Sequence, residues 1–157
     1  MTSLFPTTIY FSGSISGGRE DVGTYRMFVA ALERAGHRVL AGMVTAQHVG
    51  ADGESLSARA IFDRDLGWIE EVARDGGVLV AEVSRPSIGV GYEIGTARYR
   101  FAIPVICLWR PAFTQRCSGM IAGDSGIQLI EYTDETVPEA IENLLFAIAN
   151  KRPIRSV

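Results

Sequence analysis

The chain has 157 residues, of which 47% are hydrophobic, and its formal net charge is -3. This length fits one domain over residues 1–157, with enough apolar side chains for a continuous core. The acidic balance argues against binding to a nucleic-acid polymer, which takes a basic surface, and no apolar run approaches the ~20 residues of a membrane span.

The first half of the chain predicts two strands and two helices. A β-prone run, Thr8–Ser12, is followed by glycines, and helical spacing of apolar residues predicts a helix over Glu20–Ala35. Arg38–Ala41 predicts a weak second strand. The polar, glycine-containing stretch Met43–Leu56 predicts a loop, and Ser57–Arg74 predicts a helix that starts at a candidate N-cap serine.

The second half continues the same alternation. Val78–Val83 is apolar apart from Glu82, as expected for a central parallel strand. Arg85–Val90 has one proline and one glycine and predicts a turn, and Gly91–Phe101 predicts a helix. The remaining expected elements are the strand Pro104–Trp109, the loop Pro111–Gly126 with a helical turn, the strand Ile127–Glu131 and the amphipathic helix Glu135–Asn150.

Strands that alternate with helices indicate a parallel sheet with helices on both faces. We therefore predict an α/β fold, a flavodoxin-like, doubly wound, five-stranded parallel sheet in a single domain. Ligands of such sheets bind beyond the C-terminal ends of the strands. This rule points to three segments, Gly13–Arg19, Ser84–Glu93 and Arg110–Gly123.

The first of these segments joins a strand to a helix. Its glycines allow a ligand to approach the backbone, and the amides of a helix N-terminus favour an anion. Ser14 and Ser16 add hydroxyl donors, and Arg19 adds a positive charge. The segment matches neither a Walker loop nor a dinucleotide-binding fingerprint, so an ordinary glycine-rich turn remains the alternative.

Acidic residues provide candidates for chemistry. Glu93 is expected in the first turn of a helix, where it is either a partner of the helix dipole or a carboxylate aimed into the crevice, with Gly89 nearby. Asp63 and Asp65 are two apart and cannot share a helix face. Asp65 lies on the apolar side and could pair with Glu93, as glycosyl chemistry requires. Glu82 is expected to be a paired, structural acid.

Cysteine and histidine usage indicates neither disulfides nor a metal. Cys107 lies in an apolar run and Cys117 in a loop, which is typical of a reducing compartment, and residues 1–8 lack the regions of a secretory signal. We therefore expect the cytoplasm, or the nucleus as well in a eukaryote. His37 and His48 show no metal-ligand spacing.

Four stretches resemble the 2'-deoxynucleoside 5'-phosphate N-hydrolase family, a branch of the nucleoside 2-deoxyribosyltransferase superfamily. They are IYFSGSISGGRED, DRDLGWIEE, VAEVSRPSIGVGYEIGTA and SGMIAG, and they span about Ile9 to Tyr132 in the family's order. Two features depart from the family pattern. Ser16 stands where an arginine is common, and residues 69–77 form a slightly longer stretch, which we expect to lengthen a helix end away from the site.

The resemblance implies roles for individual residues. Glu93 matches the nucleophile that attacks the anomeric carbon, Asp65 the acid that assists departure of the base, and Tyr10 a tyrosine beside this pair. Ser118 and Met120 match residues that a neighbouring subunit contributes, which implies a homodimer. The positions that match the family's 5'-phosphate pocket are Ser14, Ile15, Gly17, Ser87 and Gly89. Ser16 and Arg19 are expected there too, from the hydroxyl and the charge that they add to the first segment.

The implied reaction is hydrolysis of a 2'-deoxynucleoside 5'-monophosphate through a glycosyl-enzyme ester, without metal or organic cofactor. Asp65, protonated, would donate to the leaving base, so the two carboxyl groups must titrate apart. Ser87 favours the nucleotide-using branch, because an acid at this place would repel a phosphate.

The sequence leaves two other functions open. One is a transferase that exchanges bases, which is the function most similar to hydrolysis, and the other is a nucleotide-binding protein without turnover. A flavodoxin-like carrier of FMN is disfavoured, because no aromatic pair is placed to sandwich a flavin.

Overall fold

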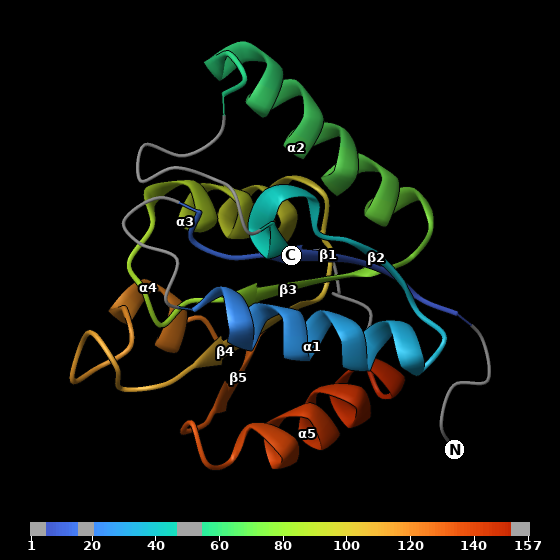
Figure 1. The fold of residues 1–157 in the computed structure, drawn as a ribbon. Helices are drawn as coiled ribbons and strands as arrows, with labels where there is room; N and C mark the ends of the chain where they lie inside the picture. The colour runs from blue at the N-terminus through green and yellow to red at the C-terminus, as the bar shows by residue number, and fades with distance from the viewer. Residues whose placement is uncertain (1–5, 16–20, 47–54, 152–157) are drawn as a thin grey trace.

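The computed structural model describes residues 6–15, 21–46 and 55–151. A single sheet of five parallel strands has the order β2-β1-β3-β4-β5, which is the flavodoxin-like order and confirms the predicted fold (Figure 1). The strands are β1 (Thr8–Ser12), β2 (Arg38–Leu40), β3 (Val78–Glu82), β4 (Val105–Trp109) and β5 (Ile127–Glu131).

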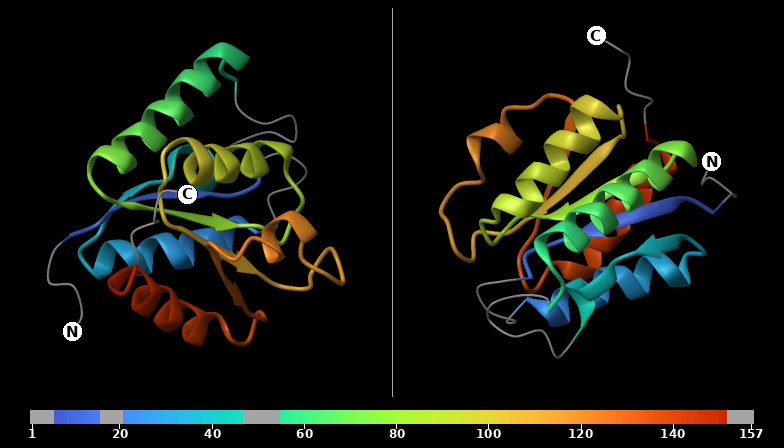
Figure 2. Two further views of the ribbon diagram at one scale, coloured as in Figure 1. Left: turned by 180° about the vertical axis from the view of Figure 1, so that it is seen from behind. Right: turned by 90° about the horizontal axis from the view of Figure 1, so that it is seen from above.

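Helices cover both faces of the sheet (Figure 2). On one face lie α1 (Val22–Arg34) and α5 (Val137–Ala149), and on the other lie α2 (Ala58–Arg74) and α3 (Ile88–Gly95). A π-helical turn, η2 (Thr96–Arg100), continues α3.

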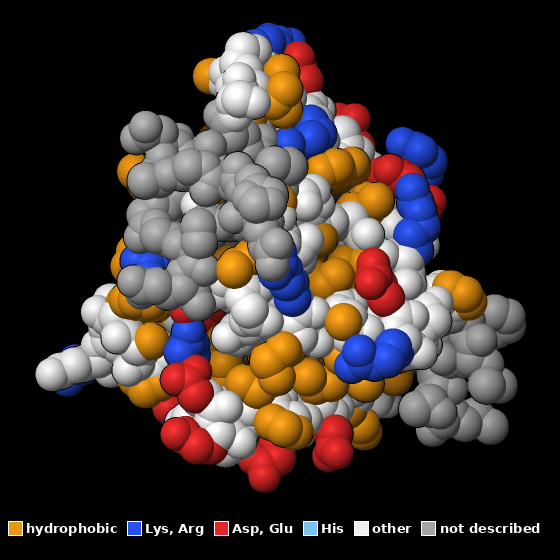
Figure 3. Space-filling model, viewed as in Figure 1, with side chains coloured by type: hydrophobic (Ala, Val, Ile, Leu, Met, Phe, Trp, Pro, Cys, Tyr) orange, Lys and Arg blue, Asp and Glu red, His pale blue; other side chains and the backbone are white. Residues whose placement is uncertain are grey.

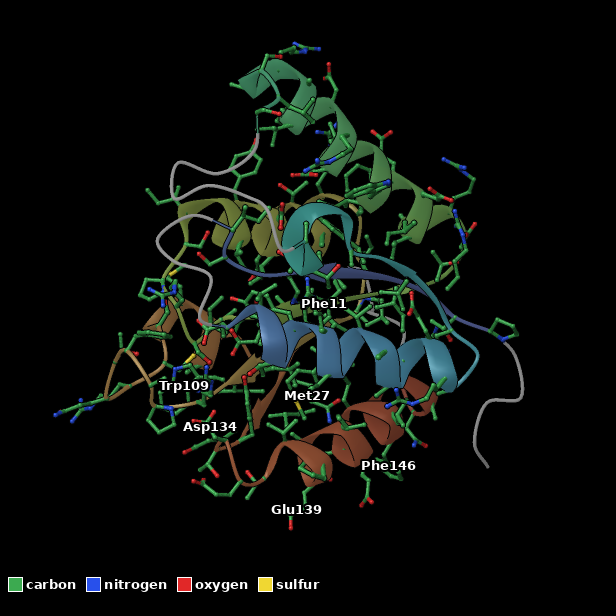
Figure 4. The ribbon with its side chains drawn as sticks, viewed as in Figure 1. Phe11, Met27, Trp109, Asp134, Glu139 and Phe146 are labelled. Carbon is green, nitrogen blue, oxygen red and sulfur yellow. The ribbon has the colours of Figure 1, made fainter. Side chains whose placement is uncertain are left out.

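Strand residues alternate between these two layers, because successive side chains of a strand point to opposite faces. Ile9 and Phe11 pack into the core under α1 and α5, where Figure 4 shows Phe11, whereas Tyr10 packs toward α2 and α3. Tyr10 and Ser12 therefore share the face that carries α3.

The helix α3 begins three residues earlier than predicted. Pro86 and Gly89 indicated a turn over Arg85–Val90, yet Ser87 acts as the N-cap and its Oγ accepts the Val90 N–H at 3.4 Å. The sequence predicted Glu93 in the first turn of this helix. Because the helix starts at Ile88, Glu93 lies in the second turn instead. This position weakens the interpretation of Glu93 as a helix-dipole partner, since the dipole acts mainly in the first turn.

Both long loops expected from the sequence contain a short helix, and one of these helices was predicted. A short 3-10 helix, η1 (Gly42–Thr45), occupies the start of the predicted loop Met43–Leu56, of which residues 47–54 lie outside the described ranges. The helical turn expected in the loop Pro111–Gly126 is α4 (Gly119–Ala122). Over the described ranges, no helix has both the length and the apolar character that crossing a membrane requires.

Candidate active site

Strand β1 presents two hydroxyl groups to one carboxylate. The Tyr10 hydroxyl donates to Oε1 of Glu93 at 3.0 Å, and the Ser12 hydroxyl donates to Oε2 of the same side chain. Each oxygen of Glu93 thus has its own donor. Sequence reasoning singled out Tyr10 and missed Ser12, although the two-residue period of a strand places both on one face.

Glu93 itself comes from the second turn of α3, on the side that faces the sheet. Burial is the main cause that raises the pKa of Glu93, to about 7, and the nearby Asp65 raises it further. The hydrogen bonds from Ser12 and Tyr10 act in the opposite direction, because they favour the ionised form. The pKa of Tyr10 is also raised, by burial and by Glu93, so its hydroxyl stays protonated as a donor.

Asp65 approaches the same carboxylate from α2. It lies within hydrogen-bonding reach of Glu93, and it accepts a hydrogen bond from Arg64 Nε at 2.8 Å. The Arg64 guanidinium lies 4.9 Å from the ring of Trp68, and Trp68 meets Tyr10 edge to face at 5.6 Å. These ring contacts fix Arg64, and with it Asp65, over the end of β1.

The two aspartates of α2 face different surroundings, as expected from their spacing. The Asp63 side chain is 53% exposed and pairs with Arg59, whereas that of Asp65 is 16% exposed. Asp63 is therefore a solvent-facing acid on the same helix and serves as a control for Asp65.

A cavity of about 370 Å³ opens between α2 and α3, and Glu93 and Asp65 lie in its wall. The wall is otherwise mostly apolar and is formed by Ala58, Ile61, Phe62, Leu66, Ile69, Ile88, Gly89, Tyr92 and Thr96. A second, smaller hollow of about 20 Å³ also contacts Glu93 and Asp65, and Tyr10, Ser12 and Ile15 line it too. The carboxyl pair therefore stands between two spaces and is reachable from the larger one.

The predicted phosphate-binding residues fall into two groups. Ser14 is buried just beyond β1, Ile15 lines the smaller hollow, Ser87 caps α3 and Gly89 lines the larger cavity. Of these described residues, Ile15 and Gly89 each line a space that Glu93 and Asp65 also line. The other predicted residues, Ser16, Gly17 and Arg19, lie outside the described ranges.

Ser118 and Met120 are not brought to this pocket by their own chain. They lie at the start of α4, and neither is among the described residues that line the two cavities. Met120 is 84% exposed. Within the described part of the chain, no three His, Cys, Asp or Glu side chains gather in a way that could hold a metal ion.

A second buried glutamate, Glu82, ends β3. It is 1% exposed and accepts hydrogen bonds from the hydroxyls of Ser84 and Tyr132, the latter at 2.9 Å. Burial raises the pKa of Glu82. Close to it, the buried Asp21 pairs with Arg85 and Arg110, which join the start of α1 to the segments that follow β3 and β4. The expectation of a paired acid at Glu82 agrees with these contacts.

Known proteins resemble the chain over most of its length, although no protein-family model matches it. It is 40% identical over 139 residues to 5-hydroxymethyl-dUMP N-hydrolase of Mus musculus, covering 85% of this chain and 77% of that protein. It is 42% identical over 119 residues to a Trichoplax adhaerens protein named "Putative 2'-deoxynucleoside 5'-phosphate N-hydrolase 1", and this match covers 74% of this chain and 75% of that protein.

A solved structure shares the fold. It is the Clostridium botulinum CMP N-glycosidase BcmB, with a TM-score of 0.58 and 17% identity, over 88% of this chain and 97% of that one. At this identity the likeness concerns the fold alone, whereas identities near 40% over most of the chain define a family. The chain therefore belongs to the family of 2'-deoxynucleoside 5'-phosphate N-hydrolases.

Proposed function

We propose that the protein hydrolyses the N-glycosidic bond of 2'-deoxynucleoside 5'-monophosphates, giving free base and 2-deoxyribose 5-phosphate. The observation that carries this proposal is the Glu93 carboxylate, which is held by two hydroxyls, lies beside Asp65 and opens onto a cavity of about 370 Å³. The names of the relatives support the same activity and a nucleotide substrate.

Glu93 acts as the nucleophile at C1' and Asp65 as the acid that protonates the leaving base. Asp65 lies within hydrogen-bonding reach of Glu93. Closely spaced carboxyls are typical of retaining glycosidases, whereas inverting enzymes hold theirs roughly 6.5–9.5 Å apart to admit a water molecule. A covalent deoxyribosyl ester on Glu93, later hydrolysed by water with retained configuration, follows from this closeness.

The proton of the pair must reach Asp65 before the chemistry begins. The raised pKa of Glu93 keeps a proton on this side chain in part of the molecules at neutral pH. Transfer of that proton to the Asp65 carboxylate leaves Glu93 ionised and Asp65 able to donate. The hydroxyls of Tyr10 and Ser12 favour this arrangement, because they donate to the ionised Glu93.

The 5'-phosphate binds at the ends of β1 and β3, to Ser14, Ile15, Ser16, Gly17, Arg19, Ser87 and Gly89. Ser87 supports this assignment, because its Oγ accepts the Val90 N–H and its hydroxyl can still donate its own proton to an anion. Its neutral side chain also avoids the repulsion that an acid would exert on a phosphate.

The decisive experiment measures base release by chromatography from deoxynucleoside monophosphates, their ribo- counterparts and the unphosphorylated nucleosides. We expect Glu93→Ala to lower kcat by about 10³-fold or more, because the nucleophile is lost. Asp65→Asn should also be strongly impaired, and Asp63→Asn, the control on the same helix, should match the wild type. Turnover of Glu93→Ala near the wild-type rate contradicts the proposal. Base exchange in the presence of a free base would identify a transferase.

A homodimer in which Ser118 and Met120 complete the neighbouring site is part of the proposal. Large apolar side chains stand exposed beside the cavity and on α4, including Ile88 (95%), Tyr92 (62%) and Met120 (84%). Met27 and Phe146 are also exposed, among the hydrophobic side chains over α1 and α5 in Figures 3 and 4. However, those helices cover the other face of the sheet, where a second subunit could not reach Glu93.

Mixing two impaired variants tests the shared site. Met120→Arg and Glu93→Gln impair different halves of each site, so heterodimers should regain one intact site and part of the activity. Sedimentation should show a dimer for the wild type. A monomer at assay concentration, or heterodimers without recovered activity, contradicts the dimer proposal.

A further inference from the structure

We infer that Ser12 is a positioning residue for the reaction, whose hydroxyl holds Oε2 of Glu93 and stabilises the carboxylate both before attack and when it leaves. The inference rests on the proposed function, since it concerns the same nucleophile. It adds a residue that the sequence patterns did not single out.

The placement of Ser12 follows from the strand itself. Ser12 is the last residue of β1 and is 1% exposed. Since it lies two residues after Tyr10, both side chains point to the α3 side of the sheet. Tyr10 takes Oε1 and Ser12 takes Oε2, so the plane of the carboxylate is fixed by two donors from one rigid strand.

The surroundings of Glu93 make the Ser12 bond consequential. From α2, Asp65 faces the carboxylate and opposes its ionisation, and Arg64 pairs with Asp65 at 2.8 Å. From β1, only uncharged hydroxyls reach Glu93 among the described residues. In a buried site, a hydrogen bond to the charged form is worth more than one in water. Removing the Ser12 donor therefore shifts the balance toward protonated Glu93.

The same hydroxyl contributes in both chemical steps. When one Glu93 oxygen bonds to C1', the C1'–N bond breaks, its electron pair leaves with the base, and the base takes the proton from Asp65. In the second step water attacks C1' and gives up a proton to the Asp65 carboxylate, while the C1'–O bond breaks and its electron pair returns to Glu93 as carboxylate charge. A fixed donor to that carboxylate stabilises the charge as it returns.

The test compares Ser12→Ala with Ser84→Ala, since Ser84 is equally buried and donates in the same way to the other buried glutamate, Glu82. We expect Ser12→Ala to lower kcat about 10- to 100-fold, as for the loss of a hydrogen bond to a charged group, with little change in KM. The acid limb of the pH–rate profile should move to higher pH in Ser12→Ala and stay in place in Ser84→Ala. Ser12→Thr, which keeps the hydroxyl, should restore both properties.

A second measurement needs no turnover. Carbon-13 NMR titration of the Glu93 carboxyl should show a higher pKa in Ser12→Ala than in the wild type. An unchanged acid limb, an unchanged titration, or equal losses in Ser12→Ala and Ser12→Thr overturn the inference about Ser12. Activity that survives Glu93→Ala overturns the proposed function, so the two failures are distinguishable.

Discussion

Two glutamates of this protein each accept hydrogen bonds from one tyrosine and one serine. Glu93 accepts from a tyrosine and a serine of β1, and Glu82 accepts from Tyr132 and from Ser84, which follows β3. Burial raises the pKa of both side chains. Local hydrogen bonding therefore does not separate the acid that we propose as nucleophile from the acid that we consider structural.

Access and neighbouring charge do separate them. Glu93 lines both cavities described above and has a second carboxyl, Asp65, within reach. Glu82 is 1% exposed, is not among the residues lining those cavities, and lies beside the Asp21, Arg85 and Arg110 ion pairs. A buried acid is therefore a candidate for catalysis when a substrate-sized space and a proton partner adjoin it.

Replacing Glu82 by alanine should have the largest effect, a loss of folding stability without a loss of activity. Glu82→Ala leaves the hydroxyls of Tyr132 and Ser84 without their acceptor and empties volume in the core. We expect the free energy of unfolding at pH 5 to fall by about 3 kcal/mol. Urea denaturation measures this loss, and base release per folded molecule should stay within about threefold of the wild type. A folded Glu82→Ala protein as inactive as Glu93→Ala would remove the distinction.

The next effect concerns Glu93 and pH. The folded protein raises the pKa of Glu93 from 4.5 to about 7, so it favours the protonated side chain. The contribution of protonated Glu93 to the free energy of unfolding is therefore complete below pH 4.5 and is lost as the pH rises through about 7. At pH 8 the ionised side chain then costs up to about 3 kcal/mol. Glu93→Gln should therefore be more stable than the wild type at pH 8, while having lost its activity. Urea midpoints at pH 4, 6 and 8 check this, and an equal difference at all three values would contradict it.

The smallest effects are expected from the two tyrosines that donate to these glutamates, Tyr10 to Glu93 and Tyr132 to Glu82. Tyr132→Phe should cost about 1 kcal/mol of unfolding free energy, the typical value of one hydrogen bond, and should not move the pH–rate profile. Tyr10→Phe should cost a similar amount but move the acid limb to higher pH, because Glu93 loses a donor. Thermal denaturation and rate profiles of both variants measure this, and a shared shift in the profiles would count against it.

Sequence patterns located the site better than they described its details. The alternation of strands and helices predicted the sheet and placed Glu93 beyond a strand end. Asp65 was proposed from its place on the apolar side of its helix, and Tyr10 only from the resemblance to the family. The start of α3 was placed wrongly, because Pro86 and Gly89 indicated a turn where Ser87 caps the helix. Ser12 was missed because a serine that ends a strand has no sequence signature until its partner on another element is known.

The order of elements, the parallel sheet and the segments beyond its strand ends were predictable from the sequence, since they follow from local periodicity and from the handedness of strand–helix–strand units. The contacts of the acids depend on how the chain folds: one oxygen of Glu93 meets Tyr10 and the other Ser12, Asp65 comes within hydrogen-bonding reach of Glu93, and Glu82 is buried. The physical reason is that ionisation depends on burial and on charges a few ångströms away. Those distances join residues as far as 83 positions apart in the chain.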